Sequence, residues 1–275
     1  MSGEFEMNEA AELLSTQIFW RIFNKSQDVE TIRRLANHGF SQMAVKAKIE
    51  AQQIAHFVAN SPEFDEIFTN KEAFFKISGG VDKFANMQAE RNINTYQVAI
   101  DAASLILTHS YLDATAFDYC RVIEMVSPQS WEKFVSDRKF TVKELKGKTY
   151  GDVLHQHVNR FVKSLERASL IEKTDRIFEI CPPPLGYVFI QGYEFNRDRL
   201  IKLDELRHDI VHGDGLKQPI SACEDELLFL QRTAMFLFGI LSKKFNVRIS
   251  PTLWVEDLKR SAGQNPNPPI APTVS

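Results

Sequence analysis

Residues 96–126, YQVAIDAASLILTHSYLDATAFDYCRVIEMV, decide the fold class of this chain. The segment contains no glycine or proline and is rich in Ala, Leu and Ile, which is typical of a helix that crosses a packed bundle. The helical pattern begins upstream at Val81, after Gly79-Gly80, and Ser127-Pro128 ends it. The sequence therefore predicts one long helix over residues 81–127.

Helical periodicity also covers the residues before this segment, over 8–24 and 30–60, with a break expected near His38-Gly39. Ser61-Pro62 ends the second helix, and short helical pieces are expected over 64–80. Apolar residues recur at spacings of three and four, so each helix is expected to bury one face. The expected buried positions are Ala11, Leu13, Leu14, Ile18, Phe19, Ile22 and Phe23, followed by Ile32, Leu35, Phe40, Ala44, Ile49, Ile54 and Phe57.

Further helices are predicted downstream, at 130–135, 141–146, 151–173, 197–212 and 221–245. Asn196 is the expected N-cap of the fourth of these, and Gly213 is its expected stop. The last helix is apolar on most sides and is expected to lie deep in the bundle. CPPPLG at 181–186 interrupts the pattern, and the β-branched and aromatic YVFIQGYEF after it is the best strand candidate, unpaired or paired with FNVRI near residue 245.

These elements predict an all-α (mainly α) protein with at most a short strand or hairpin. The expected division is an N-terminal helical region at 1–80, a helical bundle at 81–248 and a C-terminal extension at 249–275. The extension is rich in proline and is expected to be disordered from residue 261, because its composition cannot bury a core.

The composition is that of a globular protein, with 44% hydrophobic residues and a net charge of −3 over 275 residues. It excludes a disordered chain, a collagen-like fibre and a disulfide scaffold, since the three cysteines are Cys120, Cys181 and Cys223, far apart in the chain. No signal peptide and no membrane-spanning segment is recognisable. A cytoplasmic protein without a membrane partner is therefore expected.

One segment concentrates chemically active groups: LDELRHDIVHGDG, residues 203–215. Leu203, Leu206 and Ile210 are spaced as the buried stripe of a helix. Arg207, His208, Asp209 and His212 lie around that stripe, close to the helix end.

The run from Arg207 to His212 resembles the R-x4-6-H motif of the HEPN superfamily, and His208 fits the polar position after the arginine. The resemblance is good over 203–213, loose over 90–245 and absent before residue 80. It implies a four- or five-helix bundle, a homodimer that brings two motifs together and, in many members, a metal-independent endoribonuclease. Such members are toxins with a cognate antitoxin or regulatory protein, or act in phage defence. Arg33 to His38 has the same spacing, but it is interpreted as a chance match at a helix end near Gly39.

Acid–base cleavage of RNA suits these residue types. A base must remove the proton of the ribose 2′-hydroxyl, an acid must protonate the leaving 5′-oxygen, and a cation must stabilise the phosphorane. Imidazole titrates near neutral pH, and guanidinium binds phosphate oxygens with a planar fork. The hypothesis is therefore that Arg207 holds the phosphate, His212 moves protons and His208 supports both. Five residues place Arg207 and His212 about 140° apart around a helix, so a dimer interface is one way to assemble the site.

Other interpretations of the motif stay open. Asp204, His208 and His212 follow each other at steps of four, and two imidazoles at that spacing can bind Zn²⁺, with His155 and His157 as candidates for recruitment. No metal or other cofactor is predicted, because no further ligand cluster is evident. The motif could also be structural, with Arg207 and the histidines paired to neighbouring elements, as in HEPN-like modules that bind RNA, nucleotide or a protein partner without catalysis.

A basic segment offers a surface for RNA. Residues 138–173 contain nine Lys or Arg and four Asp or Glu. This excess of positive charge can bind the phosphate backbone of RNA, and Tyr150 and Phe140 are available for base stacking. For any one of these residues, a solvated face of an amphipathic helix is the simpler explanation of the charge. The residues predicted to bind RNA are Lys143, Lys146, Lys148 and Arg160.

Overall fold

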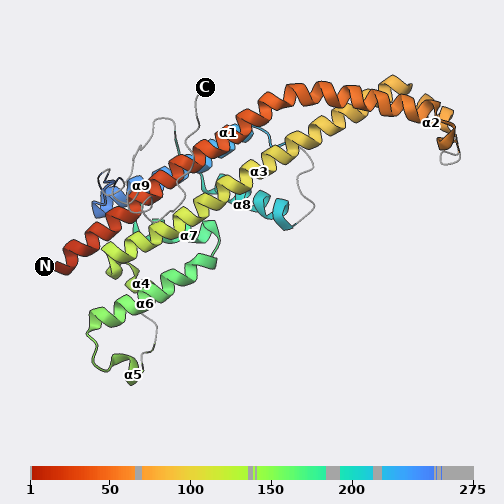
Figure 1. Ribbon diagram of the computed structural model, residues 1–275. Coiled ribbons are helices and arrows are strands. Elements are labelled where there is room, and N and C mark those ends of the chain that lie inside the picture. The colour runs from red at the N-terminus through yellow and green to blue at the C-terminus, as the bar shows by residue number, and fades with distance from the viewer. Residues whose placement is uncertain are drawn as a thin grey trace, which may run out of the picture. The chain divides into compact units, whose positions relative to one another are not determined.

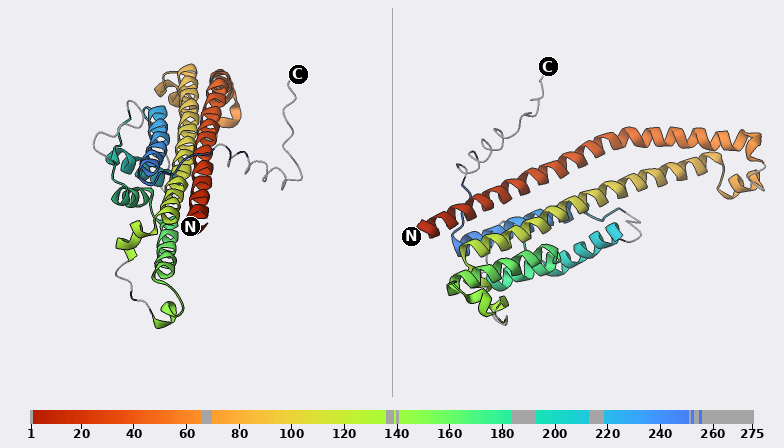
Figure 2. Two further views of the ribbon diagram at one scale, coloured as in Figure 1. Left: turned by 90° about the vertical axis from the view of Figure 1, so that its left-hand side faces the viewer. Right: turned by 60° about the horizontal axis from the view of Figure 1, so that its bottom comes forward.

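The structure, a computed structural model, describes residues 2–65, 70–135, 139, 141–183, 193–212, 219–250, 252 and 255. Every regular element in these ranges is a helix, so the predicted all-α class is confirmed (Figures 1 and 2). The long helices are α1 (Ser2–Asn60), α3 (Val81–Val126), α6 (Tyr150–Ser164), α7 (Leu170–Ile180), α8 (Arg197–His212) and α9 (Cys223–Phe245). The short helices are α2 (Lys71–Ile77), α4 (Glu132–Val135) and α5 (Val142–Leu145), with 3-10 turns at Pro62–Phe64, Pro128–Trp131 and Leu165–Arg167.

Helix ends that carry a strong local signal lie where the sequence predicts them. α1 ends before Ser61-Pro62 and α3 ends before Ser127-Pro128, because proline disfavours a helical residue before it. α8 has the predicted bounds, and Asn196 Oδ1 accepts a hydrogen bond from Arg199 N at 2.9 Å as the N-cap. α9 begins two residues after the expected start and ends at Phe245 as expected.

The break predicted near His38-Gly39 is wrong, because α1 is one continuous helix from Ser2 to Asn60. A glycine inside a helix costs about 1 kcal/mol relative to alanine, which weakens the helix without ending it. Gly39 does not have the left-handed backbone of a helix stop, whereas Gly79 and Gly80 before α3 do.

The single helix predicted over 151–173 is also wrong. The structure ends α6 at Ser164, and α7 begins only after Ser169. Ala168 between them has an extended backbone, and the Ser169 side chain accepts a hydrogen bond from Glu172 N at 3.1 Å. Ser-x-x-Glu is a helix-start pattern, so a new N-cap overrides the helical periodicity here.

Parts of the remaining predictions fall outside the described residues. These are 187–192 of the strand candidate, Gly213 and the tail at 261–275. Residues 193–195 and 246–249, which are described, form no strand. The predicted division at residues 80 and 248 stays a prediction.

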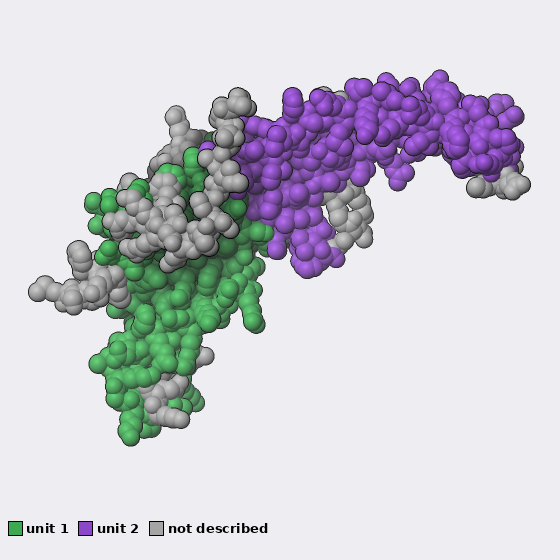
Figure 3. Space-filling model, in the orientation of Figure 1, with its two compact units in different colours: residues 1–25, 109–204, 228–275 green, residues 26–108, 205–227 purple. Residues whose placement is uncertain are grey.

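The chain forms two compact units (Figure 3). Unit 1 consists of residues 1–25, 109–204 and 228–275, and unit 2 consists of residues 26–108 and 205–227. Each unit therefore combines segments that lie far apart in the sequence, and each is described below by itself.

Unit 1 has an aromatic and aliphatic core. Trp131 is fully buried against Phe134 and Phe161. Tyr119, also fully buried, donates a hydrogen bond from its hydroxyl to the carbonyl of Ala234 in α9 at 3.1 Å. The burial predicted for the last helix is confirmed, with buried residues along α9 that include Phe229, Leu230, Ala234, Phe236, Leu237, Ile240 and Leu241.

Unit 2 contains a helical hairpin in which residues 26–60 of α1 and 81–108 of α3 lie side by side, joined through α2 (Figures 1 and 2). Near the α2 end of this hairpin, the core consists of small residues, Ala51 and Ala55 of α1 with Ala85 and Ala89 of α3. Alanine at these positions allows two helix backbones to approach closely. Phe74, Phe75 and Phe84 cluster where α2 meets the start of α3.

The buried face predicted for residues 30–60 is wrong for most of the large side chains, although Phe40 is half-buried. Ile32, Leu35, Ile49, Ile54 and Phe57 are all exposed. The alanine positions of α1 face α3 instead, so the periodicity identified residues that share a side of the helix but not the side that is covered.

All three cysteines are buried free thiols. Among the described residues, no helix combines the length and the apolar composition needed to cross a membrane.

Because α1 runs through Gly39 and a Cβ there would contact nothing within 4 Å, we predict that Gly39→Ala raises the free energy of unfolding by about 0.5–1 kcal/mol. Urea denaturation measures the change. Gly79→Ala is the control and should be destabilising, because Gly79 has a φ of +81° and a Cβ there would lie 2.7 Å from Lys83 Cδ. A loss of stability in Gly39→Ala would contradict the continuous helix.

Candidate functional site

The motif residues lie in the last turns of α8. Arg207 is partly buried, whereas His208 and His212 are exposed. The rings of the two histidines are neighbours, with centroids 4.9 Å apart and planes at 48°, because residues four apart share a helix face. Arg207 Nε is buried without a hydrogen-bond partner among the described residues. A guanidinium and two imidazoles are therefore available within one helix end.

The stripe predicted for this helix is confirmed in part. Leu203 is buried, but Leu206 and Ile210 are only half-buried. The buried residues of α8 are Leu200 and Leu203, in its first half. The second half of the helix, which carries the motif, is thus the more accessible half.

The structural interpretation of the motif predicts ion pairs for Arg207 and the histidines. Within the described residues, no hydrogen bond or ion pair joins the side chains of Arg207, His208 or His212 to another side chain. Their one described side-chain interaction is the contact between the two imidazoles. Among the described residues, the motif therefore makes none of the ion pairs that the structural interpretation predicts.

The metal interpretation needs further ligands. No group of three or more His, Cys, Asp or Glu within the described ranges is arranged to hold a metal ion. Asp204 has its Oδ1 2.7 Å from Nε2 of the buried His109. His155 is exposed on α6, and His157 on the same helix is buried.

The predicted RNA-binding residues lie in unit 1, on α5, α6 and the segment between them. Lys146, Lys148 and Arg160 are exposed, and Lys148 Nζ donates a hydrogen bond to Gln156 Oε1 at 2.7 Å. Lys143 is on α5, but its side chain lies outside the described residues. These cations are exposed and lie on neighbouring segments of one unit. RNA binding by this unit stays a prediction.

One cation of the basic segment is not available for a nucleic acid. Lys173 is buried, with its Nζ 2.8 Å from Asp113 Oδ1. Tyr150, proposed for stacking, is exposed and donates its hydroxyl hydrogen to Glu132. That hydrogen bond raises the pKa of Tyr150. Phe140 lies outside the described residues.

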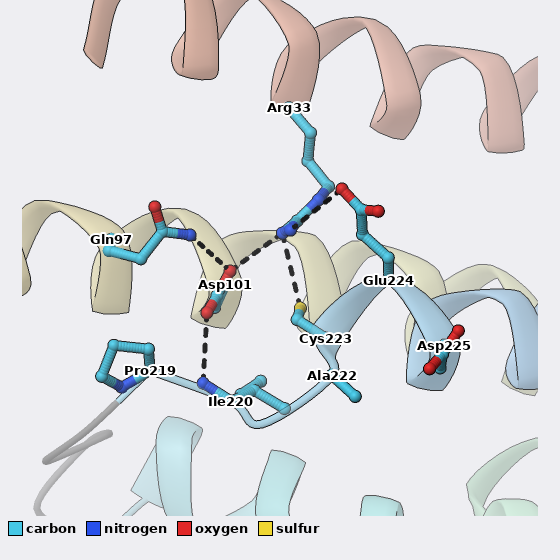
Figure 4. Close-up of a pocket in the computed structure, with 9 residues that line it drawn as sticks. All are labelled: Arg33, Gln97, Asp101, Pro219, Ile220, Ala222, Cys223, Glu224 and Asp225. Atoms are coloured by element: carbon cyan, nitrogen blue, oxygen red, sulfur yellow. Dashed lines mark hydrogen bonds and ion pairs between the residues drawn. The ribbon is translucent and has the colours of Figure 1, made fainter. Parts of the chain in front are cut away.

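A polar cluster that sequence reasoning missed lies in unit 2, around the buried carboxylate of Asp101 in α3 (Figure 4). Arg33 Nη1 of α1 and Gln97 Nε2 donate hydrogen bonds to Asp101 Oδ1 at 2.9 and 3.0 Å. Ile220 N donates to Oδ2 at 3.1 Å. The guanidinium also donates to Cys223 Sγ at 3.4 Å and lies 4.0 Å from Glu224.

A cavity of about 370 Å³ adjoins this cluster (Figure 4). Burial raises the pKa of Cys223 to about 12, and the nearby Arg33 charge only partly opposes this effect. The thiol is therefore protonated at neutral pH and is no nucleophile. Burial lowers the pKa of Arg33, but the hydrogen bond to Asp101 and nearby negative charge outweigh it, so the net shift is upward. The cluster is thus suited to holding structure rather than to proton transfer.

The Asp101 cluster fixes the chain just after the motif. Ile220 belongs to the segment that leads into α9, eight residues beyond His212, and Cys223 is the first residue of α9. One signal in the sequence points to it. Asp101 is the one Asp, Glu, Lys or Arg between Tyr96 and Leu112, and a charged group in an apolar helix requires a buried partner.

No protein-family model, curated protein or solved structure matches this chain. The assignment of a function therefore depends on the residues themselves and on the motif resemblance.

We predict that Asp101→Ala lowers the free energy of unfolding by about 3–5 kcal/mol, because it leaves the largely buried Arg33 guanidinium with only the exposed carboxylate of Glu224, 4.0 Å away, as counter-ion. Arg34→Ala is the control. Arg34 pairs with Glu30, but both side chains are mostly exposed, and the expected cost is about 0–1 kcal/mol. Urea denaturation of both variants gives the comparison, and equal effects would contradict a structural role of the Asp101 cluster.

Proposed function

We propose that the protein is a metal-independent endoribonuclease of the HEPN type that cleaves single-stranded or looped RNA. The observation that supports this most directly is the exposed pair of imidazoles, His208 and His212, with rings 4.9 Å apart at the end of α8. Arg207 precedes them on the same helix, with a buried Nε that has no partner among the described residues. These groups match the requirements of phosphoester cleavage by acid–base chemistry.

In the proposed reaction the ribose 2′-hydroxyl loses its proton to a base, and its oxygen attacks the adjacent phosphorus. The bond from phosphorus to the 5′-oxygen breaks, and an acid donates a proton to that oxygen. The products are a 2′,3′-cyclic phosphate and a 5′-hydroxyl, so atoms and electrons balance without a metal or an oxidant. We assign the proton transfers to His212, phosphate binding to Arg207 and support of both to His208.

A dimeric site follows from the helix geometry. Arg207 and His212 lie about 140° apart around α8, so one helix does not direct both groups to one phosphate. A two-fold interface that contains the ends of two α8 helices would supply arginine from one copy and histidine from the other. The monomer would then be inactive.

The family resemblance also suggests where such an enzyme acts. We propose a cytoplasmic toxin or phage-defence protein, controlled by a cognate antitoxin or another regulatory protein. RNA is the proposed substrate, and no membrane and no cofactor is involved.

A second candidate function is a non-catalytic helical module that binds RNA, a nucleotide or a protein partner. The exposed cations Lys146, Lys148 and Arg160 favour RNA among these ligands. This module would need no proton transfer, so the histidines would be dispensable.

We predict that the purified protein cleaves RNA in the presence of EDTA, and that His212→Ala and Arg207→Ala each lower the rate about 10²–10⁴-fold. Arg207→Lys should not restore activity, because lysine lacks the planar fork. Cleavage of a fluorescently labelled RNA measures the rates. His155→Ala removes another exposed histidine and should leave the rate unchanged.

Cleavage that survives both alanine substitutions would overturn the assignment of the site. A folded protein that binds RNA without cutting it would favour the second candidate.

We predict that replacing Lys146, Lys148 and Arg160 with glutamine weakens RNA binding and flattens its salt dependence. Each lost phosphate contact should reduce the slope of log K against log salt by about 0.7 for single strands. The control replaces three exposed lysines of α1 and α3 (Lys25, Lys48 and Lys83) with glutamine. Fluorescence anisotropy at several salt concentrations compares the two triple variants, and equal slopes would exclude the basic segment as the RNA surface.

A further inference from the structure

α1 carries two parallel rows of residues along the hairpin arm of unit 2. The inner row faces α3 and consists of Phe40, Ala44, Ala47, Ala51, Ala55 and Val58, which are buried or half-buried. The outer seam consists of Ile32, Leu35, Gly39, Met43, Lys46, Glu50, Ile54 and Phe57. From Gly39 onward, each member of the seam directly precedes a residue of the inner row in the sequence. α3 packs against the inner row, although Phe40, Ala44 and Ala47 of this row also line a groove between the two helices. The side chains of the outer seam are exposed.

The outer seam has the spacing of a helix-packing surface. Its members follow each other at intervals of three, four and four residues, which is an eleven-residue repeat. Such a repeat has about 3.67 residues per turn, close to a straight helix, so the seam stays on one side of α1 throughout. Its large apolar members are 47–68% exposed.

A groove widens the surface beside the middle of the seam. It has a volume of about 470 Å³ and lies between α1 and α3. Met43, Lys46 and Glu50 of the seam form one side, and α3 residues that include Ile93 and Tyr96 form the other. A helix laid along the seam would therefore contact both helices of the hairpin, as in a four-helix bundle.

Lys46 and Glu50 indicate which partner would dock on the outer seam. They are the two charged members of the seam, are mostly exposed and lie 3.6 Å apart at its centre. Lysine before glutamate is the weaker order for a pair within one helix, so intrahelical stability alone is a poor reason for it. In an antiparallel pairing centred at residue 48, Lys46 of each copy faces Glu50 of the other. A parallel pairing would instead place like charges opposite each other.

We propose that the outer seam is a self-association surface, on which the same seam of a second copy of this chain docks antiparallel through a two-fold axis near residue 48. The two seams then overlap over residues 39–57, where the apolar members Met43, Ile54 and Phe57 pack against the facing seam, and the two central charge pairs set the register. The surface contains no residue of the 207–212 motif, so the proposal is independent of ribonuclease activity.

Sedimentation velocity of the full-length protein over a concentration series tests the proposal. The wild type should dimerise. Lys46→Glu and Glu50→Lys should each weaken the dimer about tenfold or more, because each creates like-charge contacts across the axis. The double variant K46E/E50K should return to within about threefold of the wild type, since opposite charges again face each other.

Two further variants separate the seam from other surfaces. Ile54→Glu removes an apolar member and should abolish association through the seam, so the variant should sediment at a lower mass than the wild type, and any dimer that remains is the one proposed at the α8 ends. Val45→Glu is the matched control, because Val45 is equally exposed on α1 but does not belong to the seam, and its dimer should match the wild type. Circular dichroism checks that every variant keeps its helix content.

A monomeric wild type, a dimer that neither single charge reversal weakens, or a double variant weaker than both single variants would each overturn the proposal.

Discussion

The buried carboxylate of Asp101 is the interaction on which the organisation of unit 2 depends. Asp101 lies in α3, in a stretch of the helix that is otherwise largely apolar. A buried charge is tolerated only when it is paired and hydrogen-bonded. Arg33, Gln97 and the amide of Ile220 supply that environment. One charged group thereby links α1, α3 and the segment that enters α9, so three separate parts of the sequence are held by one set of donors.

Local signals made much of the fold predictable. Proline after serine ended α1 and α3, and an asparagine cap began α8, because these residues act on the backbone within one helical turn. The differences arise from the relative strength of such signals. Gly39 alone is too weak a signal to end a helix, whereas Ser169 with Glu172 is strong enough to begin a new one.

The pairing of distant residues was less predictable. Periodicity grouped Ile32, Leu35, Ile54 and Phe57 on one side of α1, but it cannot say which side a neighbouring helix covers. Arg33 illustrates the same difficulty, since its neighbours in the sequence do not indicate that it pairs with Asp101, 68 positions away. For the candidate site, the sequence alone predicts Arg207, His208 and His212, and this stays a prediction. The contact between the two histidine rings and the lack of a described partner for Arg207 Nε required coordinates.

The proposed chemistry depends on the end of α8, where two accessible imidazoles lie close to each other. The chain beyond it is held at Ile220, whose amide donates a hydrogen bond to Asp101. The most direct test of this account is mass spectrometry of the RNA fragments that the purified protein releases in EDTA. Acid–base cleavage by this helix end predicts fragments with 2′,3′-cyclic phosphate and 5′-hydroxyl ends. Intact RNA, or fragments with 5′-phosphate and 3′-hydroxyl ends, would contradict it.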